Sequence, residues 1–443
     1  MGKFFKFLLT GLSILLFVSI YIPLPNGTMF LLTLAGIFLT LGTMNAPSRG
    51  LALMLFSGNF FGNIFTLWNI NFPAYILCVL IGFFHVRRYY RSFLHEQAII
   101  ITFVILLLFF GFTFLIGPMH AYSQQKILYI TVIGSVSLLA WTVSIQSPDI
   151  ELDKQAQYLL FISLGYISIA YEFYDFRRPA SPLDFNFFRE SFTFVTRKLE
   201  ESMNFTYQTV GISAMYAVAF IIGKVRPRLG KSPLLLITLL LSVGIILIAQ
   251  ARQAIFGFLI LLLARIMLDM RTKSYIKMFR LIVLACFAVF LLTNVKSDVM
   301  EKSLHATNST DFFNRDYENV GDAVSNRSIF FGTGLGGYSQ NGQRAYPHNI
   351  ALEIYYETGI LGVIFISGLL LFSLFTRQSP FNRITRSEFY ILIPVTGFFV
   401  KAIISSDLTE NIAFLTALIV ILNIKRTHPN TISQNESNLF RKR

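Results

Sequence analysis

The residues best suited to chemistry lie between Phe331 and Gly362, in the segment FGTGLGGYSQNGQRAYPHNIALEIYYETGILG. Its histidine, His348, directly precedes an apolar stretch that starts near Ile350 and predicts a helix. Histidine titrates near neutral pH and suits proton abstraction from a hydroxyl, so His348 is a candidate general base. The alternative interpretation is an ordinary histidine that caps the helix at a membrane interface.

Two carboxylates follow the histidine. Glu353 and Glu357 are four residues apart, which places them on one face of the predicted helix. A carboxylate at the head of a membrane helix is costly unless it faces a bundle interior or water. Either carboxylate could orient His348, or both could simply be solvated.

A glycine cluster precedes the histidine, at Gly332, Gly334, Gly336 and Gly337. Three of these match the dinucleotide-binding pattern G-x-G-x-x-G. We interpret that match as coincidental, because it follows no predicted strand and opens no βαβ unit. The alternative is a loop end in which glycine supplies turns with positive φ.

Isolated arginines are the second chemical signal. Arg252 lies in a turn between two apolar stretches with almost no other charge nearby, and a guanidinium grips a phosphate bidentately. Its alternative role is a single interfacial anchor. Arg315, in DFFNRDYENV, could equally be a solvated arginine paired with a neighbouring aspartate. Arg177 and Arg178 could also meet a polyanion. Arginines, a histidine and no metal cluster fit a phosphate-bearing ligand.

These residues must be positioned by membrane helices. Of 443 residues, 54% are hydrophobic and only 14% are charged, whereas a soluble chain would carry roughly 25% charge. Continuous apolar runs predict α-helices, since lipid offers the backbone no partners. The predicted fold class is all-α, a polytopic transmembrane helix bundle of about 12–14 spans. Candidate spans lie at about 4–22, 28–44, 51–67, 72–86, 98–116, 127–146, 157–171, 207–223, 233–249, 254–269, 279–293, 355–375, 388–404 and 411–424.

Orientation follows from Lys and Arg, which favour the cytoplasmic side. With both termini in the cytoplasm, most basic clusters fall inside, and the short outer turns hold only Lys126, Arg252 and Lys401. The net charge of +14 is thereby explained by topology, with no nucleic-acid partner. Cys78 and Cys286 lie in apolar runs and predict neither a disulfide nor a metal site.

The chain divides into a membrane domain, 1–426, and a polar cytoplasmic tail, 427–443, which we expect to be disordered. Two long outer loops, about 172–205 and 294–349, hold most of the polar candidates. Together with the turn at 250–254, they are expected to form the active site.

The pattern G-x-G-x-G, then His-Asn, an apolar helix start, Glu and Gly-Ile-Leu-Gly resembles the O-antigen ligase and polymerase superfamily. Here it is GTGLGGY followed by YPHNIALEIYYETGILG. The Arg252 turn and the Arg315 segment also resemble that family's arginine motifs. The resemblance is sharp over about residues 250–365 and elsewhere concerns hydropathy alone.

The resemblance implies a C-type, metal-independent, inverting glycosyltransferase of the bacterial inner membrane, with no cofactor. Its donor would be an oligosaccharide on undecaprenyl diphosphate, at the periplasmic face. His348 would take the acceptor hydroxyl's proton, while Arg252 and Arg315 would neutralise the departing diphosphate. The expected substrate-binding residues are Arg252, Arg315, Gly334, Gly336, Tyr346, Asn349, Glu353, Arg177 and Arg178.

Three functions compete. The Tyr-Pro-His-Asn form and the following Leu-Glu favour a polymerase of O-antigen or other surface polysaccharide repeat units. The alternative is a ligase that moves the glycan to lipid A–core. A transporter or flippase of lipid-linked oligosaccharide would place polar sites near the midplane on broken helices, whereas the span interiors here are nearly uncharged. Expected partners are the lipid-linked donor, a glycan or lipid A–core acceptor, membrane lipid, and chain-length regulator and flippase proteins.

Overall fold

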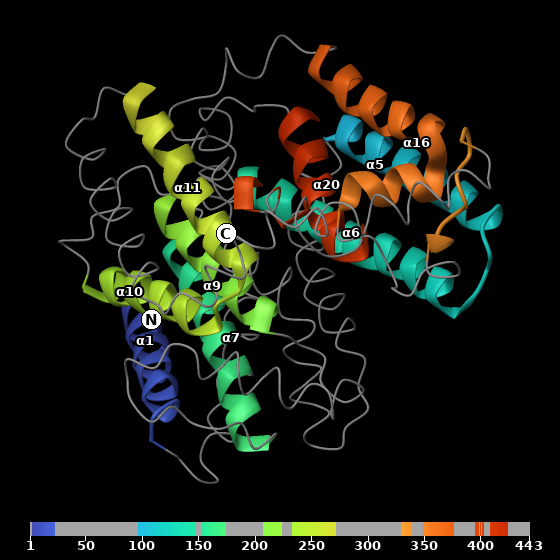
Figure 1. The fold of residues 1–443 in the computed structure, drawn as a ribbon. Helices are drawn as coiled ribbons and strands as arrows, with labels where there is room; N and C mark the ends of the chain where they lie inside the picture. The colour runs from blue at the N-terminus through green and yellow to red at the C-terminus, as the bar shows by residue number, and fades with distance from the viewer. Residues whose placement is uncertain are drawn as a thin grey trace, which may run out of the picture.

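The described part of the chain folds into α-helices joined by turns (Figure 1), and it contains no strand. The computed structural model describes residues 2–22, 96–146, 152–173, 207–223, 233–271, 329–338, 349–375, 395–397, 399, 401–402 and 408–423. Their helices are α1 (Gly2–Ser19), α5 (Gln97–Leu115), α6 (Ala121–Gln146), α7 (Leu152–Phe173), α9 (Tyr207–Ile222), α10 (Pro233–Ala249), α11 (Arg252–Arg271), α16 (Ile350–Phe375) and α20 (Leu408–Asn423).

Each of these helices coincides with a predicted span, which confirms the all-α class. The predicted spans 28–44, 51–67, 72–86 and 279–293 lie outside the described residues, and 388–404 is described only at six helical positions. Three helices are long and apolar enough to cross a membrane, Gln97–Leu115, Ala121–Thr142 and Ile350–Leu371. Five shorter apolar helices accompany them in the described part. The number of spans stays a prediction.

One group of packed helices consists of α1, α7, α9, α10 and α11. At its centre α9 packs against α7, α10 and α11, and its residues from Val210 to Ile222 are buried. Polar side chains also join neighbouring helices: Gln157 of α7 donates to Thr10 of α1 at 3.0 Å. Such hydrogen bonds add to the van der Waals packing that holds membrane helices together.

The second group consists of α5, α6, α16 and α20. It lies on the right of Figure 1. Trp141 of α6 donates its indole N–H to the carbonyl of Ala413 in α20 at 3.2 Å. Phe109 of α5 stacks on Phe365 of α16, with ring centroids 4.4 Å apart. This group carries the glycine segment described below.

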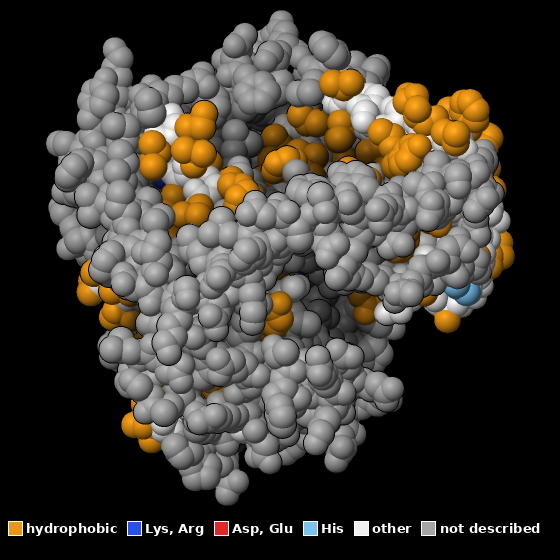
Figure 2. All heavy atoms as spheres, in the orientation of Figure 1, with side chains coloured by type: hydrophobic (Ala, Val, Ile, Leu, Met, Phe, Trp, Pro, Cys, Tyr) orange, Lys and Arg blue, Asp and Glu red, His pale blue; other side chains and the backbone are white. Residues whose placement is uncertain are grey.

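The outer faces of α5 and α16 are apolar. Figure 2 shows apolar side chains gathered at the upper right, over the region of these helices. On α5 the exposed large side chains include Leu108, Phe112 and Leu115, and on α16 they include Ile364 and Leu371. A helix that is apolar on its outer face as well as its inner face suits a lipid environment.

Helix α16 is broken at Gly359, whose φ of 65° and ψ of −170° are not helical. The sequence predicts an uninterrupted span at 355–375, so this expectation is wrong at Gly359. The break divides α16 into a head, residues 350–358, and a membrane part that begins at Ile360. Glycine accounts for it, since a residue with a Cβ rarely adopts a positive φ.

Candidate functional site

The break in α16 is filled by residues 329–338, which we call the glycine segment. A break inside a membrane helix frees backbone groups that must find other partners. Here the glycine segment supplies those partners on both sides of Gly359. The pairs, donor first, are Thr333 N to Tyr356 O at 3.1 Å, Gly334 N to Glu357 O at 2.9 Å, Ile360 N to Ile329 O at 3.0 Å and Leu361 N to Phe330 O at 3.2 Å.

Glycine is required in this segment for two reasons. Gly332, Gly334 and Gly336 have φ values of 66°, 77° and 80°, which confirms the prediction of turns with positive φ. Space is also lacking: a Cβ on Gly334 would overlap the backbone of Gly117, at the end of α5, and one on Gly336 would overlap Ser123 of α6. Both glycines are buried by protein. Their predicted contact with substrate stays a prediction.

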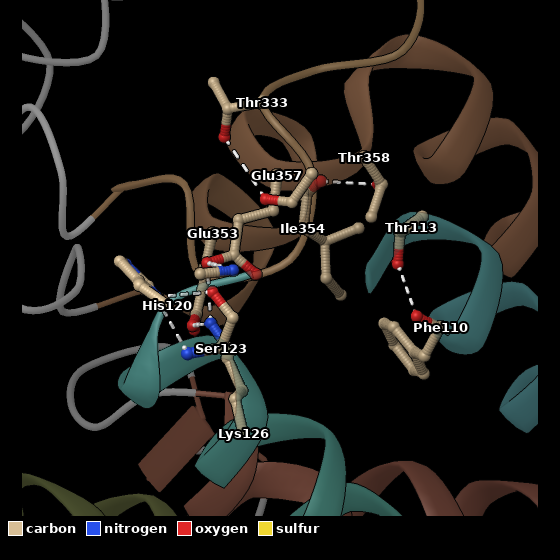
Figure 3. A network of polar contacts seen from close by, with 12 residues as sticks. Phe110, Thr113, His120, Ser123, Lys126, Thr333, Glu353, Ile354, Glu357 and Thr358 are labelled. Atoms are coloured by element: carbon tan, nitrogen blue, oxygen red, sulfur yellow. Dashed lines mark hydrogen bonds and ion pairs between the residues drawn. The ribbon is translucent and has the colours of Figure 1, made fainter. Parts of the chain in front are cut away.

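A buried charge cluster lies beneath the glycine segment (Figure 3). Lys126 of α6 contacts Oε1 of Glu353 and, at 2.7 Å, Oε1 of Glu357, both in the head of α16. The side chains of Lys126 and Glu353 are 0% exposed and that of Glu357 is 1% exposed. Oε1 of Glu357 also accepts the backbone N–H of Gly336 at 3.0 Å. We call these three side chains the Lys126 cluster.

The position of Lys126 corrects the predicted start of the span at 127–146. The sequence places it in a short outer turn before a span at 127–146, but α6 begins at Ala121 and Lys126 is buried in its second turn. The polar run SQQK hides the helix start from a hydropathy argument: Gln124 and Gln125 are exposed, and the cost of burying Lys126 is met by its partners on α16. Lys401, also expected in an outer turn, lies on helical residues 401–402.

The same cluster weakens one argument against transport. The sequence predicts span interiors that are nearly uncharged, yet three charged side chains lie buried between α6 and α16, beside a broken helix. The two carboxylates are confirmed to face the bundle interior rather than water. Since one oxygen of each carboxylate contacts Lys126, the ammonium of Lys126 is already neutralised and is a poor candidate for a phosphate ligand.

Asn349 caps the head of α16. Its side-chain oxygen accepts the N–H of Ala351 at 2.9 Å and that of Leu352 at 3.3 Å, which satisfies donors that a helix start leaves unpaired. His348 therefore immediately precedes a capped helix. The side-chain oxygen of Asn349 is engaged in this cap, so the amide nitrogen is the part of its side chain that a substrate could contact.

A second histidine, which the sequence argument did not consider, lies at the start of α6. Nδ1 of His120 accepts the N–H of Ser123 at 3.0 Å and lies 2.6 Å from the hydroxyl of Ser123. A Cβ built on Gly336 would be 3.1 Å from the His120 ring, so this pair borders the glycine segment. The available signal was spacing: His120, Ser123 and Lys126 are three residues apart and so lie along one side of a helix start.

Arg252 is the first residue of α11, and only Gln250 and Ala251 separate it from the end of α10, which confirms the predicted turn. Gly211 of α9 allows this turn to pack closely, because a Cβ there would be 2.8 Å from that of Ala251. The Arg252 side chain lies outside the described residues, as do His348, Arg315, Tyr346, Arg177 and Arg178.

The structure thus brings together Gly334, Gly336, Asn349 and Glu353 around the head of α16, and it places the backbone of Arg252 in the other helix group. Among the described residues, no group of three or more His, Cys, Asp or Glu could hold a metal ion.

Part of the chain that contains this site matches a known protein family. Residues 237–367 match a family model described as O-Antigen ligase. The match runs from α10 through the glycine segment to the membrane part of α16, so it contains Arg252, Arg315 and His348. No curated protein matches the chain. The match confirms the resemblance seen in the sequence: residues 237–367 are similar to the O-antigen ligase family, in a chain whose described part contains three helices long and apolar enough to cross a membrane, and this supports a role in ligating or polymerising lipid-linked polysaccharide.

Proposed function

We propose that the protein is a metal-independent, inverting glycosyltransferase that polymerises surface-polysaccharide repeat units carried on undecaprenyl diphosphate. The observation that supports this most is that a single matched segment, 237–367, contains the candidate base and both candidate phosphate ligands. The reaction takes place on the periplasmic face. An acceptor hydroxyl attacks the anomeric carbon of the donor sugar, the hydroxyl loses its proton, and the lipid diphosphate departs.

His348 is the proposed base. It precedes the capping residue of a head whose far end is paired with the glycine segment, so its backbone is attached to a fixed helix start. Proximity of a positioned base to the hydroxyl is what makes proton abstraction efficient. Tyr346 and Asn349, on either side of His348, are proposed to contact the sugar.

Arg252 and Arg315 are proposed to neutralise the diphosphate. A helix N-terminus favours an anion, because its first N–H groups point outward and the helix dipole is positive there. Arg252 begins the 20-residue helix α11, and the preceding residue, Ala251, has no side-chain oxygen to cap those N–H groups. An arginine at such a position adds a planar pair of donors to an existing preference for negative charge. Arg177 and Arg178 are proposed to add further positive charge.

Two other functions remain candidates for specific reasons. The matched family is described as a ligase, which favours transfer to lipid A–core as the second candidate. Transport is favoured by one feature only, the broken helix α16 beside buried charges. The family match counts against transport.

The test has two arms. In a deletion strain, core carrying a single repeat unit would identify a polymerase, whereas unsubstituted core with accumulating lipid-linked polymer would identify a ligase. In detergent, purified protein is given lipid-linked repeat units, and product length is read by gel and mass spectrometry. Transport needs two compartments, so glycan transfer in detergent supports a transferase. If the protein restores export of lipid-linked oligosaccharide to the deletion strain but transfers no glycan in detergent, the proposed transferase activity is refuted.

A further inference from the structure

We infer that Lys126 is a positioning residue for the transfer reaction: through Glu353 and Glu357 it fixes the head of α16, and with it the attachment point of His348, against the glycine segment. The expected effect on transfer rests on the proposed function, whereas the contacts between Lys126 and the head of α16 do not depend on it. Lys126 lies outside the matched segment 237–367, so the contact is made by a part of the chain that the family match does not cover.

The first step is that one ammonium holds both ends of the head. Glu353 lies in the first turn of α16, and Glu357 lies two residues before the break at Gly359. Both contact Nζ of Lys126, which comes from the second turn of α6. A rigid helical segment held at two points along its length cannot pivot about either one.

The second step is that the membrane part of α16 does not set the direction of the head. Gly359 interrupts the helix, and the amides of Ile360 and Leu361 pair with the glycine segment instead of the preceding turn. The head and the membrane part are therefore two helices joined at a bend. The head is instead held by polar contacts with Lys126 of α6 and with the glycine segment, in addition to the apolar packing of Ile350 and Ile354 in the core.

The third step joins all three elements at one atom. Oε1 of Glu357 accepts from Lys126 of α6 and from the N–H of Gly336, while Glu357 itself belongs to the head (Figure 3). Gly336 in turn lies against Ser123 and His120 at the start of α6. Moving any one of these elements disturbs the contacts of the other two.

The fourth step concerns energy. Buried charges cost several kcal/mol of desolvation each, which their attraction recovers only in good geometry, so such a cluster contributes more to a unique arrangement than to net stability. Removing one partner leaves the others uncompensated and strongly favours other arrangements. A base displaced by 1 Å can lose about 10²-fold in rate, although substrate binding elsewhere is retained.

Two variants remove the charged contacts of the Lys126 cluster, a third restores the positive charge, and a fourth is the control. Lys126→Met removes the ammonium, and the triple variant Lys126→Met/Glu353→Gln/Glu357→Gln removes all three charges at similar volume. The triple variant leaves no uncompensated buried charge, so it serves if Lys126→Met cannot be purified. Lys126→Arg restores the positive charge. The matched control is Trp141→Phe, which removes a buried hydrogen bond from α6 to α20.

Position is measured without any activity. Spin labels are placed at Phe331 in the glycine segment and Ala351 in the head, which are both exposed, in a chain whose Cys78 and Cys286 are replaced by serine. Wild type and Trp141→Phe should give one narrow distance distribution. Lys126→Met or the triple variant should give a broad or shifted one, and Lys126→Arg should restore most of the wild-type distribution. An unchanged distribution in the uncharged variants would overturn the inference.

The consequence is measured in the detergent transfer assay. Lys126→Met or the triple variant should lower kcat by about 10²-fold with KM for the lipid-linked donor within about threefold, and Lys126→Arg should recover much of kcat. Equal kcat per folded molecule in wild type and the uncharged variants would overturn the positioning role. If wild type transfers no glycan, the proposed function fails, and the spin-label distances still decide whether the cluster positions the head.

Discussion

Replacing Gly359 by alanine should destabilise the protein and open the contact between α16 and the glycine segment. Gly359 has a φ of 65° and a ψ of −170°, a combination almost confined to glycine that costs another residue about 1–3 kcal/mol. The added Cβ would also overlap the carbonyl of Phe330 and lie 2.6 Å from the amide of Gly332. Both neighbours are backbone atoms, so neither can move aside as a flexible side chain would.

The magnitude follows from what must be given up. Separating the glycine segment from α16 breaks at least two backbone hydrogen bonds, Ile360 N to Ile329 O and Leu361 N to Phe330 O. Each is worth about 0.5–1.5 kcal/mol. With the conformational cost, the expected loss is about 2–6 kcal/mol. If α16 straightens instead, the alanine gains about 1 kcal/mol of helix propensity but all four pairs with the glycine segment are lost.

The assay compares Gly359→Ala with Gly368→Ala in the same helix. A Cβ on Gly368 meets nothing within 4 Å, so this control should be neutral or stabilising by about 0.5–1 kcal/mol. Thermal unfolding in detergent gives the order of stability, and protease cleavage at the glycine segment reports its release. If Gly359→Ala is as stable as Gly368→Ala, and its glycine segment is cleaved no faster, the break is not required by the fold.

The remaining predictions concern chemistry. Asn349→Ala should cost about 1 kcal/mol of stability through the lost cap, whereas Asn349→Asp should keep the cap; lost transfer in Asn349→Asp would identify the amide nitrogen as a substrate contact, and full transfer would exclude it. Arg252→Ala should abolish transfer while the protein still inserts, and Arg252→Lys should recover little, because it lacks the planar fork; full activity of the lysine variant would leave only a point-charge role. His348→Ala should lower kcat by about 10²–10⁴-fold, with no rescue by His348→Asn, which cannot accept the proton. Transfer should persist in excess chelator, and dependence on magnesium or manganese would contradict the role of the arginines.

The helices were largely predictable because membrane spans are long apolar runs with one possible backbone structure. The span predicted at 233–249 is α10 itself, and the turn at Arg252 follows from the three polar residues Gln250, Arg252 and Gln253 between two apolar stretches. Helix starts were less predictable where polar residues begin the helix. At α6 the six residues from Ala121 to Lys126 were assigned to a turn, since their polarity argues against membrane burial until their partners are known.

The site was predictable only where local spacing carries it. The positive φ of the glycines and the shared face of Glu353 and Glu357 follow from residue type and an i,i+4 interval. The partner of those carboxylates, Lys126, is 227 residues from Glu353 along the chain, and nothing local indicates that pairing. The break at Gly359 was equally hidden, because a glycine in an apolar helix is usually tolerated without a bend.

Because α16 is broken, the direction of its membrane part and the direction of its head are set separately, which one straight helix would not allow. A span must follow the lipid, so its direction is set by packing against neighbouring helices such as α5, as the stacked pair Phe109 and Phe365 shows. A base must instead meet a hydroxyl within hydrogen-bond reach. With the bend at Gly359, the head contacts Lys126 and the glycine segment while the membrane part follows its own direction. Buried charge beside a broken helix, a feature also expected of transporters, then has an explanation within the proposed transferase: it would hold a short helix that begins two residues after His348, the proposed base.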